Sequence, residues 1–146
     1  MRTYRLALIG FGNVGQGLAT ILRDHSQMIA QQHDVEYRIV AVNTGRHGSI
    51  YNPEGFDPGM LLAAYEQTNR LDSVPAPNIG WDVPRIIYES NADVIVELTS
   101  SDLLSGEPAA GYIRAALRQD RHVVTTNKGP IALFYPELSA AAAERG

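Results

Sequence analysis

The chain has 146 residues, of which 45% are hydrophobic and 19% are charged, and its formal net charge is −4. This composition is that of an ordinary globular protein, and the length suits one domain with a proper core. The mild negative charge and the lack of any lysine or arginine run give no indication of a nucleic-acid partner, and the absence of cysteine excludes disulfides and a thiol nucleophile.

An apolar run near the amino terminus leads directly into a glycine cluster. We predict a strand over about Tyr4 to Ile9 and a helix over about Asn13 to Gln31. Between them Gly10, Gly12 and Gly15 have the G-x-G-x-x-G spacing of dinucleotide-binding proteins. In that motif the first glycine makes a tight turn, the second leaves room for a pyrophosphate, and the third lets the helix pack closely on the strand. The alternative is a glycine-rich turn without a ligand.

The predicted first helix has apolar residues at spacings of three and four, which favours an amphipathic helix that packs on a sheet. These residues are Val14, Leu18, Ile21 and Leu22. The free N–H groups and the positive end of the helix dipole would face the phosphates of a bound dinucleotide.

A second strand, predicted over Glu36 to Val42, ends where the cofactor is normally selected. A carboxylate at this place accepts hydrogen bonds from the adenosine ribose of NAD. This sequence has none there; instead Asn43 can bond to a ribose hydroxyl and Arg46 can pair with a 2′-phosphate. We therefore expect NADP, or loose discrimination between NADP and NAD. The alternative for Arg46 is a solvated loop residue.

The least regular part of the sequence is residues 48–80. Asp57 followed by Pro58 is typical of a helix start, and we predict a helix that runs to about Asn69. Residues 73–80 contain two prolines and are predicted to form a loop. Trp81 is expected to be a packing residue rather than a base-stacking one. One face of the predicted helix carries Met60, Leu61, Ala64 and Tyr65.

The second half of the chain alternates helices and strands. We predict helices over Asp82 to Glu89, Glu107 to Gln119 and Tyr135 to Arg145, and strands over Asp93 to Leu98 and Arg121 to Thr125. Strands that alternate with helices indicate a parallel sheet joined by right-handed crossovers. The expected fold is therefore a Rossmann-type, doubly wound α/β domain with three layers, α/β/α, over residues 1–146.

Polar residues follow two of these strands and should meet the glycine cluster at one edge of the sheet. Thr99 and Ser100 would lie beside the nicotinamide ribose or carboxamide. Asn127 and Lys128 would lie at the mouth, where an ammonium could orient a carbonyl oxygen or donate a proton to it. Without a family assignment, a solvated loop residue is the slightly favoured interpretation of Lys128. Glu97 is either a polar group of the cleft or a structural anchor.

Other classes of site find no support in the sequence. The four histidines lack any metal-ligand spacing, so we expect no metal site. No nucleophile elbow and no Walker lysine follow the glycines, which disfavours a hydrolase or an NTPase. The start of the chain lacks the layout of a signal peptide, and no apolar run approaches the roughly 20 residues of a membrane span. We expect a cytoplasmic protein that binds neither nucleic acid nor membranes.

Four segments, in this order and spacing, resemble the amino-terminal half of homoserine dehydrogenase. They are Gly10–Gly15, Val96–Ser100, Gly106–Ala109 and His122–Pro130. The resemblance covers nearly all of the chain and is weak only over residues 48–81. It implies a domain of an enzyme that reduces aspartate semialdehyde to homoserine with NADPH or NADH, on the route to threonine, methionine and isoleucine.

The resemblance also implies roles for individual residues. By motif, the glycine-loop positions Phe11, Gly12, Asn13 and Val14 bind the cofactor, and Thr99 and Ser100 lie along its nicotinamide side. Lys128 matches the lysine of the family's T-x-N-K-[GA]-P element, which reaches both cofactor and substrate.

Members of that family continue beyond the resembling region with a last strand, a substrate segment and a catalytic domain that forms a homodimer. We therefore expect the present chain to be an excised nucleotide-binding domain or a truncated relative. It should bind a nicotinamide dinucleotide but need the other domain for its small-molecule substrate and for turnover. The alternatives are another NAD(P)-dependent dehydrogenase of aspartate-like substrates and a stand-alone NAD(P)-sensing module.

Overall fold

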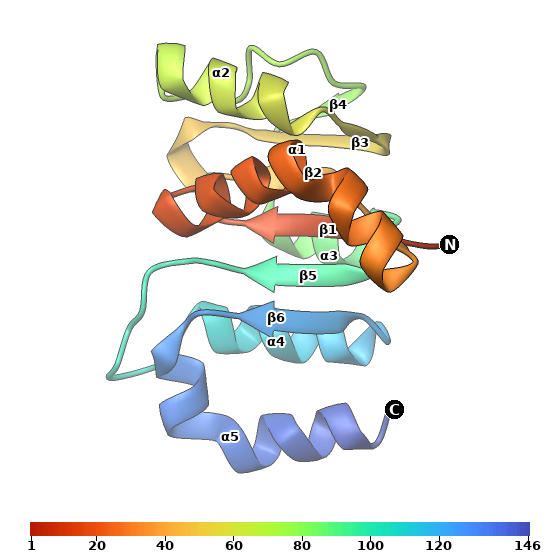
Figure 1. Ribbon diagram of the computed structural model, residues 1–146. Helices are drawn as coiled ribbons and strands as arrows, with labels where there is room; N and C mark the ends of the chain where they lie inside the picture. The colour runs from red at the N-terminus through yellow and green to blue at the C-terminus, as the bar shows by residue number, and fades with distance from the viewer.

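One sheet of six strands, in the order β4-β3-β2-β1-β5-β6, forms the middle layer of the molecule. The structure is a computed structural model that describes all residues from Met1 to Gly146, and Figure 1 shows the sheet nearly face-on. The strands are β1 (Arg2–Ile9), β2 (Val35–Asn43), β3 (Ser49–Phe56), β4 (Asn78–Ile79), β5 (Val94–Glu97) and β6 (His122–Thr125).

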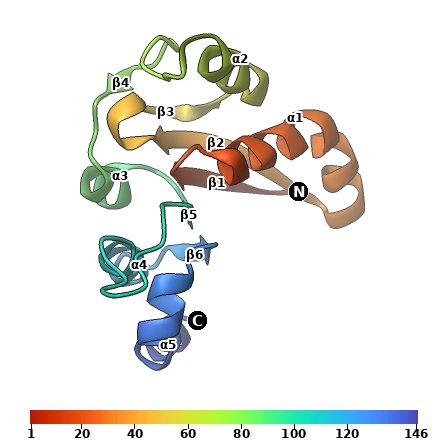
Figure 2. The same ribbon diagram turned by 90° about the vertical axis from the view of Figure 1, so that its left-hand side faces the viewer.

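Helices cover both faces of this sheet (Figures 1 and 2). The helices α1 (Asn13–His33) and α2 (Pro58–Thr68) lie on one face, and α3 (Val83–Glu89) and α4 (Ala109–Arg118) lie on the other. The last helix, α5 (Lys128–Ala143), lies beyond β6 and packs against α4. The predicted three-layer Rossmann-type fold is therefore confirmed. None of the helices combines the length and the apolar character that crossing a bilayer requires.

The central strands pair in parallel, and their registers bring four strand ends together. The last residue of β1, Ile9, lies opposite Asn43 at the end of β2 and opposite Glu97 at the end of β5. Glu97 in turn lies opposite Thr125, the last residue of β6. Ligands of open α/β sheets bind outside such carboxyl ends, so this edge is where a functional site is expected.

The prediction of a wholly parallel sheet is wrong at one edge, where β3 pairs antiparallel with both β2 and β4. Only the five residues 44–48, which include the 3₁₀ turn Gly45–His47, separate β2 from β3. A parallel connection needs a dozen or more residues. Because this link is much shorter, β3 must run antiparallel to β2. Pro53 and Gly55 break the apolar pattern of β3, which is why residues 48–56 gave no strand prediction.

Each face of the sheet has its own apolar core, built from alternating residues of the same strands. In β1, Leu6 and Leu8 pack under α1 and α2, whereas Ala7 and Ile9 pack under α3 and α4. All four side chains are buried. Burial on both faces explains why the second half of this strand, Leu6 to Ile9, is wholly apolar.

The apolar stripe predicted for α1 is partly wrong. The buried residues of α1 are Gly15, Ala19 and Leu22, whereas Val14 and Ile21 are 54% and 49% exposed. The small residues Gly15 and Ala19 let the helix lie close to the sheet, and this rotates the larger apolar side chains outward.

The last helix starts earlier than predicted, at Lys128 rather than at Tyr135. The side chain of Asn127 caps it by accepting a hydrogen bond of 3.2 Å from the N–H of Gly129. The helix tolerates Pro136 because its backbone is kinked at Phe134, where φ is −131° and ψ is 17°.

Candidate functional site

Two adjoining cavities lie along the carboxyl edge of the sheet. The first has a volume of about 350 Å³, and the second, of about 540 Å³, shares four residues with it and reaches beyond the end of β2. The first is lined by Ile9, Gly10, Gly12, Asn43, Thr44, Gly45, Val83, Leu98, Thr99, Ser100, Pro108 and Tyr112. The structure thus brings the predicted glycine loop, Asn43, Thr99 and Ser100 into one crevice.

Each glycine of the G-x-G-x-x-G motif has a different environment. Gly10 has a φ of 112°, and a Cβ built on it would meet the carbonyl oxygen of Leu98 at 2.8 Å. A Cβ on Gly15 would lie 3.0 Å from the carbonyl oxygen of Gly10, so this glycine permits the close packing of α1 on β1. A Cβ on Gly12 would meet no protein atom within 4 Å. The space above Gly12 is therefore free for a ligand's phosphates, as the motif requires.

The amino terminus of α1 presents its backbone to this space. Gly12 is the cap residue, and no side chain accepts a hydrogen bond from the first turn. Asn13 and Val14 are exposed there. The side chain of Phe11 is only 2% exposed and packs edge-on against Tyr65, with ring centroids 5.4 Å apart. Phe11 can therefore contact a ligand only through its backbone.

At the end of β2, the side chain of Asn43 is used to build the crevice. Its Nδ2 donates to the carbonyl of Trp81 at 3.1 Å, and its Oδ1 accepts from the N–H of Gly45 at 2.9 Å. Its carbonyl oxygen also accepts from the N–H of Gly10 at 2.8 Å. Asn43 thus ties three segments together, and a contact to a ribose hydroxyl would be additional to these bonds.

Two arginines, Arg46 and Arg70, and two carboxylates, Asp72 and Asp82, line the second cavity. Arg46 is exposed there and forms no ion pair. Arg70 comes from the segment after α2 and donates to the carbonyl of Arg46 at 3.3 Å. Its guanidinium pairs with Asp72 at 2.5 Å, which raises the pKa of Arg70 and lowers the pKa of Asp72 through their hydrogen bonds. Sequence reasoning missed Arg70 because residues 48–80 gave no clear chain path.

Trp81 also lines the second cavity, and its ring contacts two protein side chains. Its centroid lies 4.6 Å from that of Tyr51, and the guanidinium of Arg85 lies 4.3 Å from it. These contacts support the predicted packing role. Tyr112, from α4, lines both cavities and was not predicted. Burial raises its pKa, with a further contribution from the charges of Asp82 and Glu97.

The ends of β5 and β6 are joined by a buried hydrogen-bond network. The carboxylate of Glu97, which has no exposed surface, accepts hydrogen bonds from Thr99 and Thr125. The Nδ2 of Asn127 lies 3.3 Å from the carbonyl oxygens of Thr99 and Ser100. Asn127 is 2% exposed, so it does not line the crevice but supports the Thr99–Ser100 segment that does.

Lys128 stands at the first position of α5 and not in a loop, and its side chain is exposed. Its backbone N–H lies 3.3 Å from the hydroxyl of Ser101. It is not among the residues that line either cavity. The structure therefore places Lys128 next to the Thr99–Ser101 segment but outside the crevice itself.

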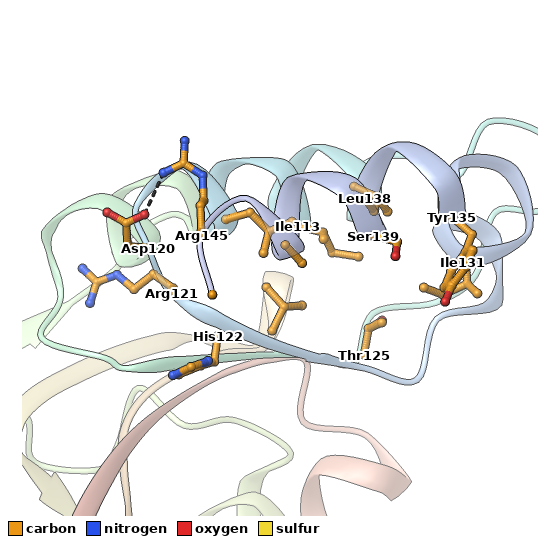
Figure 3. A pocket seen from close by; sticks show the side chains of 14 residues that line it. Ile113, Asp120, Arg121, His122, Thr125, Ile131, Tyr135, Leu138, Ser139 and Arg145 are labelled. Carbon is orange, nitrogen blue, oxygen red and sulfur yellow. Dashed lines mark hydrogen bonds and ion pairs between the residues drawn. The ribbon is translucent and has the colours of Figure 1, made fainter.

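A separate cavity of about 430 Å³ lies between α5 and β6 (Figure 3). Apolar side chains such as Ile113, Tyr135 and Leu138 face it, and an ion pair of 2.7 Å between Arg145 and Asp120 lies at one end. None of the predicted site residues lines it. It is distinct from the crevice at the carboxyl edge of the sheet.

Residues 10–146 match a protein-family model described as "Homoserine dehydrogenase, NAD binding domain". Among curated proteins, the chain is 33% identical to a homoserine dehydrogenase of Methanocaldococcus jannaschii, over 97% of this chain and 41% of the relative. It is 36% identical to an NAD(+)-dependent homoserine dehydrogenase of Pseudomonas canavaninivorans, over 97% of this chain and 40% of the relative. The chain thus spans about two-fifths of the length of these relatives.

Among solved structures, the chain is similar to a hyperthermophilic archaeal homoserine dehydrogenase in complex with NADPH. The TM-score is 0.75 and the sequence identity 26%, and the match covers 98% of this chain and 41% of the other. The fold, the motif spacing and the sequence similarity therefore agree with one another.

Proposed function

The chain belongs to the family of homoserine dehydrogenase NAD-binding domains, and on that premise we propose how its residues hold the cofactor. The pyrophosphate lies over Gly12, against the N–H groups of the first turn of α1. The nicotinamide half extends toward Thr99 and Ser100, and the adenosine half extends past Asn43 into the second cavity. The observation that carries this proposal is the open space above Gly12 beside an uncapped helix terminus.

For the adenosine end, we propose that Arg46 and Arg70 face the 2′-phosphate of NADP. Both guanidinium groups line the second cavity, and Arg46 has no competing carboxylate. The carboxylate of Asp72, which pairs with Arg70, also makes NAD binding possible, because a carboxylate near the adenosine ribose suits NAD. We therefore propose that the domain accepts both cofactors and binds NADPH more tightly.

We propose that the longer enzyme interconverts L-homoserine and L-aspartate 4-semialdehyde. The bound cofactor supplies the hydride, and the protein orients it. Lys128 would hold an ammonium group beside the nicotinamide end, where it could interact with a developing alkoxide. This proposal is supported by the match of His122–Pro130 to the family pattern and by the position of Lys128 next to Ser101.

We also propose that residues 1–146 form one domain of a cytoplasmic enzyme that is a homodimer. The two cores on a single shared sheet support a single folding unit. The curated relatives are about two and a half times as long as the matched region, and we assign the small-molecule substrate and the dimer contacts to their other part. On this view the present chain alone binds the cofactor without turnover.

Calorimetric titration of the 146-residue chain with NADPH, NADH, NADP and NAD tests the proposal. We expect dissociation constants in the micromolar range or weaker, with NADPH binding more tightly than NADH. Failure of all four dinucleotides to bind would contradict the proposed function.

A further inference from the structure

Glu97 is a buried carboxylate whose role is not explained by cofactor contact. It has no exposed surface and lines neither cavity of the candidate site. It forms no ion pair with an arginine or lysine. A buried carboxylate without a cation is costly unless hydrogen-bond donors replace the lost water. The donors that surround Glu97 therefore indicate what the residue does.

Those donors come from the ends of two neighbouring strands. Oε1 of Glu97 accepts from the N–H of Thr99 at 2.8 Å and also from the Thr99 hydroxyl. Oε2 accepts from the hydroxyl of Thr125 at 2.8 Å. Both carboxylate oxygens are thus satisfied, one by the end of β5 and the other by the end of β6.

The same two threonine hydroxyls also contact Asn127. The hydroxyl of Thr125 accepts from the N–H of Asn127 at 3.0 Å, and that of Thr99 lies 3.3 Å from Nδ2 of Asn127. An ionised carboxylate can only accept hydrogen bonds. Each hydroxyl must therefore donate to Glu97 and keeps its oxygen free to accept from Asn127. The charge of Glu97 fixes the direction of the whole network.

Asn127 connects this network to the crevice. Its Nδ2 also faces the carbonyl oxygens of Thr99 and Ser100, and its Oδ1 caps the helix that begins with Lys128. The positions of the Thr99–Ser100 segment and of Lys128 therefore depend on the same side chain.

We propose that Glu97 is a positioning residue of the nicotinamide subsite. By fixing Thr99 and Thr125 as donors, it holds Asn127, and through Asn127 it holds the two segments that face the nicotinamide half of the cofactor. This inference rests on the proposed function. It differs from a purely structural role, in which Glu97 would only support the fold and affect all parts of the binding site alike.

Two substitutions disturb the network without changing its shape. Glu97→Gln replaces one acceptor oxygen by an NH₂ donor, so one threonine hydroxyl must accept from the amide and loses the acceptor for its own proton. Thr125→Val removes the hydroxyl that links Glu97 to Asn127. Thr126→Val is the matched control, because Thr126 is exposed and its hydroxyl has no hydrogen-bond partner in the structure.

The experiment compares whole and half cofactors on the 146-residue chain. Affinities for NADPH and NADH are measured by nicotinamide fluorescence, and the affinity for ADP, which lacks the nicotinamide half, is measured by calorimetry. We expect Glu97→Gln and Thr125→Val each to weaken NADPH and NADH about five- to tenfold, the size expected for one lost hydrogen bond. The affinity for ADP should stay unchanged in both, and Thr126→Val should bind all three ligands like the wild type.

Equal losses for ADP and for the dinucleotides would show a general structural role and overturn the inference, as would unchanged affinity for all three. Thermal melting identifies a variant that does not fold; if Glu97→Gln is one, Thr125→Val alone decides. If the wild-type chain bound no dinucleotide at all, the proposed function would fail first, and this inference with it.

Discussion

The guanidinium of Arg5 and the carboxylate of Asp93 meet at two points, Nε to Oδ2 at 2.9 Å and Nη2 to Oδ1 at 2.7 Å. The backbone N–H of Arg5 donates to the same Oδ2 at 2.9 Å. The N–H of Asp93 donates in return to the carbonyl of Arg5 at 2.8 Å. This paired contact joins β1 to the start of β5, at the far end of β5 from the candidate site. It explains why an arginine, Arg5, directly precedes the buried apolar half of β1.

The stability of the fold should therefore depend on the charge of Asp93. Hydrogen bonds from Arg5 lower the pKa of Asp93, against an opposing effect of burial. Because the folded pKa lies below the unfolded value of about 3.9, the stabilisation is fully present above that pH and is lost as the pH falls through the folded pKa. We expect Asp93→Asn to lower the free energy of unfolding by about 1–2 kcal/mol at neutral pH, since both side chains are partly exposed.

Urea denaturation at neutral pH and at several values below pH 4 measures this effect. The difference between wild type and Asp93→Asn should shrink as the medium becomes more acidic. Glu36→Gln serves as a control, because the pair of Glu36 with Arg38 is on the surface and should contribute less than about 1 kcal/mol. A difference for Asp93→Asn that did not change with pH would mean that packing, not charge, is responsible.

Gly10 should tolerate a side chain less well than any glycine in an open turn. An added Cβ would combine a positive φ of 112° with a contact of 2.8 Å to the Leu98 carbonyl oxygen. We expect Gly10→Ala to destabilise the domain by about 3 kcal/mol or more, from backbone strain and overpacking together. Gly80→Ala isolates the first part, since φ is 80° there and no atom lies within 4 Å, and it should cost about 1–2 kcal/mol. Equal losses in the two variants, measured by thermal or urea denaturation, would argue against the close contact.

Sequence patterns predicted the central part of this fold because local and tertiary preferences agree there. The apolar runs of β1 and β5 are buried on both faces. The helix starts predicted at Asp57 and Asp82 are confirmed: Asp57 accepts from the N–H of Met60 at 3.0 Å, and Asp82 accepts from the N–H of Arg85 at 2.8 Å. Such signals depend only on neighbouring residues, so a single sequence contains them.

The features that sequence patterns missed depend on distant partners. The local sequence does not show that residues 49–56 form a strand, because Pro53 and Gly55 interrupt the strand pattern. These residues become a strand through their pairing with β2. Tyr112 enters the crevice through the orientation of α4, and Arg70 through the path of the segment after α2. The roles of Glu97 were left open because its donors, Thr99 and Thr125, come from two different strand ends.

The space above Gly12 offers a direct test of the cofactor's position. A valine at this position meets no protein atom near its Cβ, so the fold should be retained. The side chain would instead occupy the place proposed for the pyrophosphate, and we expect Gly12→Val to abolish measurable binding of NADPH and NADH. Gly17→Val is the matched control, because Gly17 lies in the same helix and is equally open. Calorimetry on both variants decides; normal binding by Gly12→Val would leave the glycine loop with only a structural role.

The choice between NADP and NAD should depend on both arginines of the second cavity. Hydrogen bonds between charged groups contribute about 1.5–3 kcal/mol each, so loss of one guanidinium should weaken NADPH binding by about tenfold or more. Arg46→Ala should therefore weaken NADPH much more than NADH. Arg70→Ala should also weaken NADPH more than NADH, but by less, because the Arg70 guanidinium of the wild type already pairs with Asp72. Arg38→Ala, on the surface beside Glu36, is the control and should change neither affinity. Titrations of each variant with both cofactors give the ratio of affinities directly, and a ratio unchanged by Arg46→Ala would remove the 2′-phosphate from its proposed place.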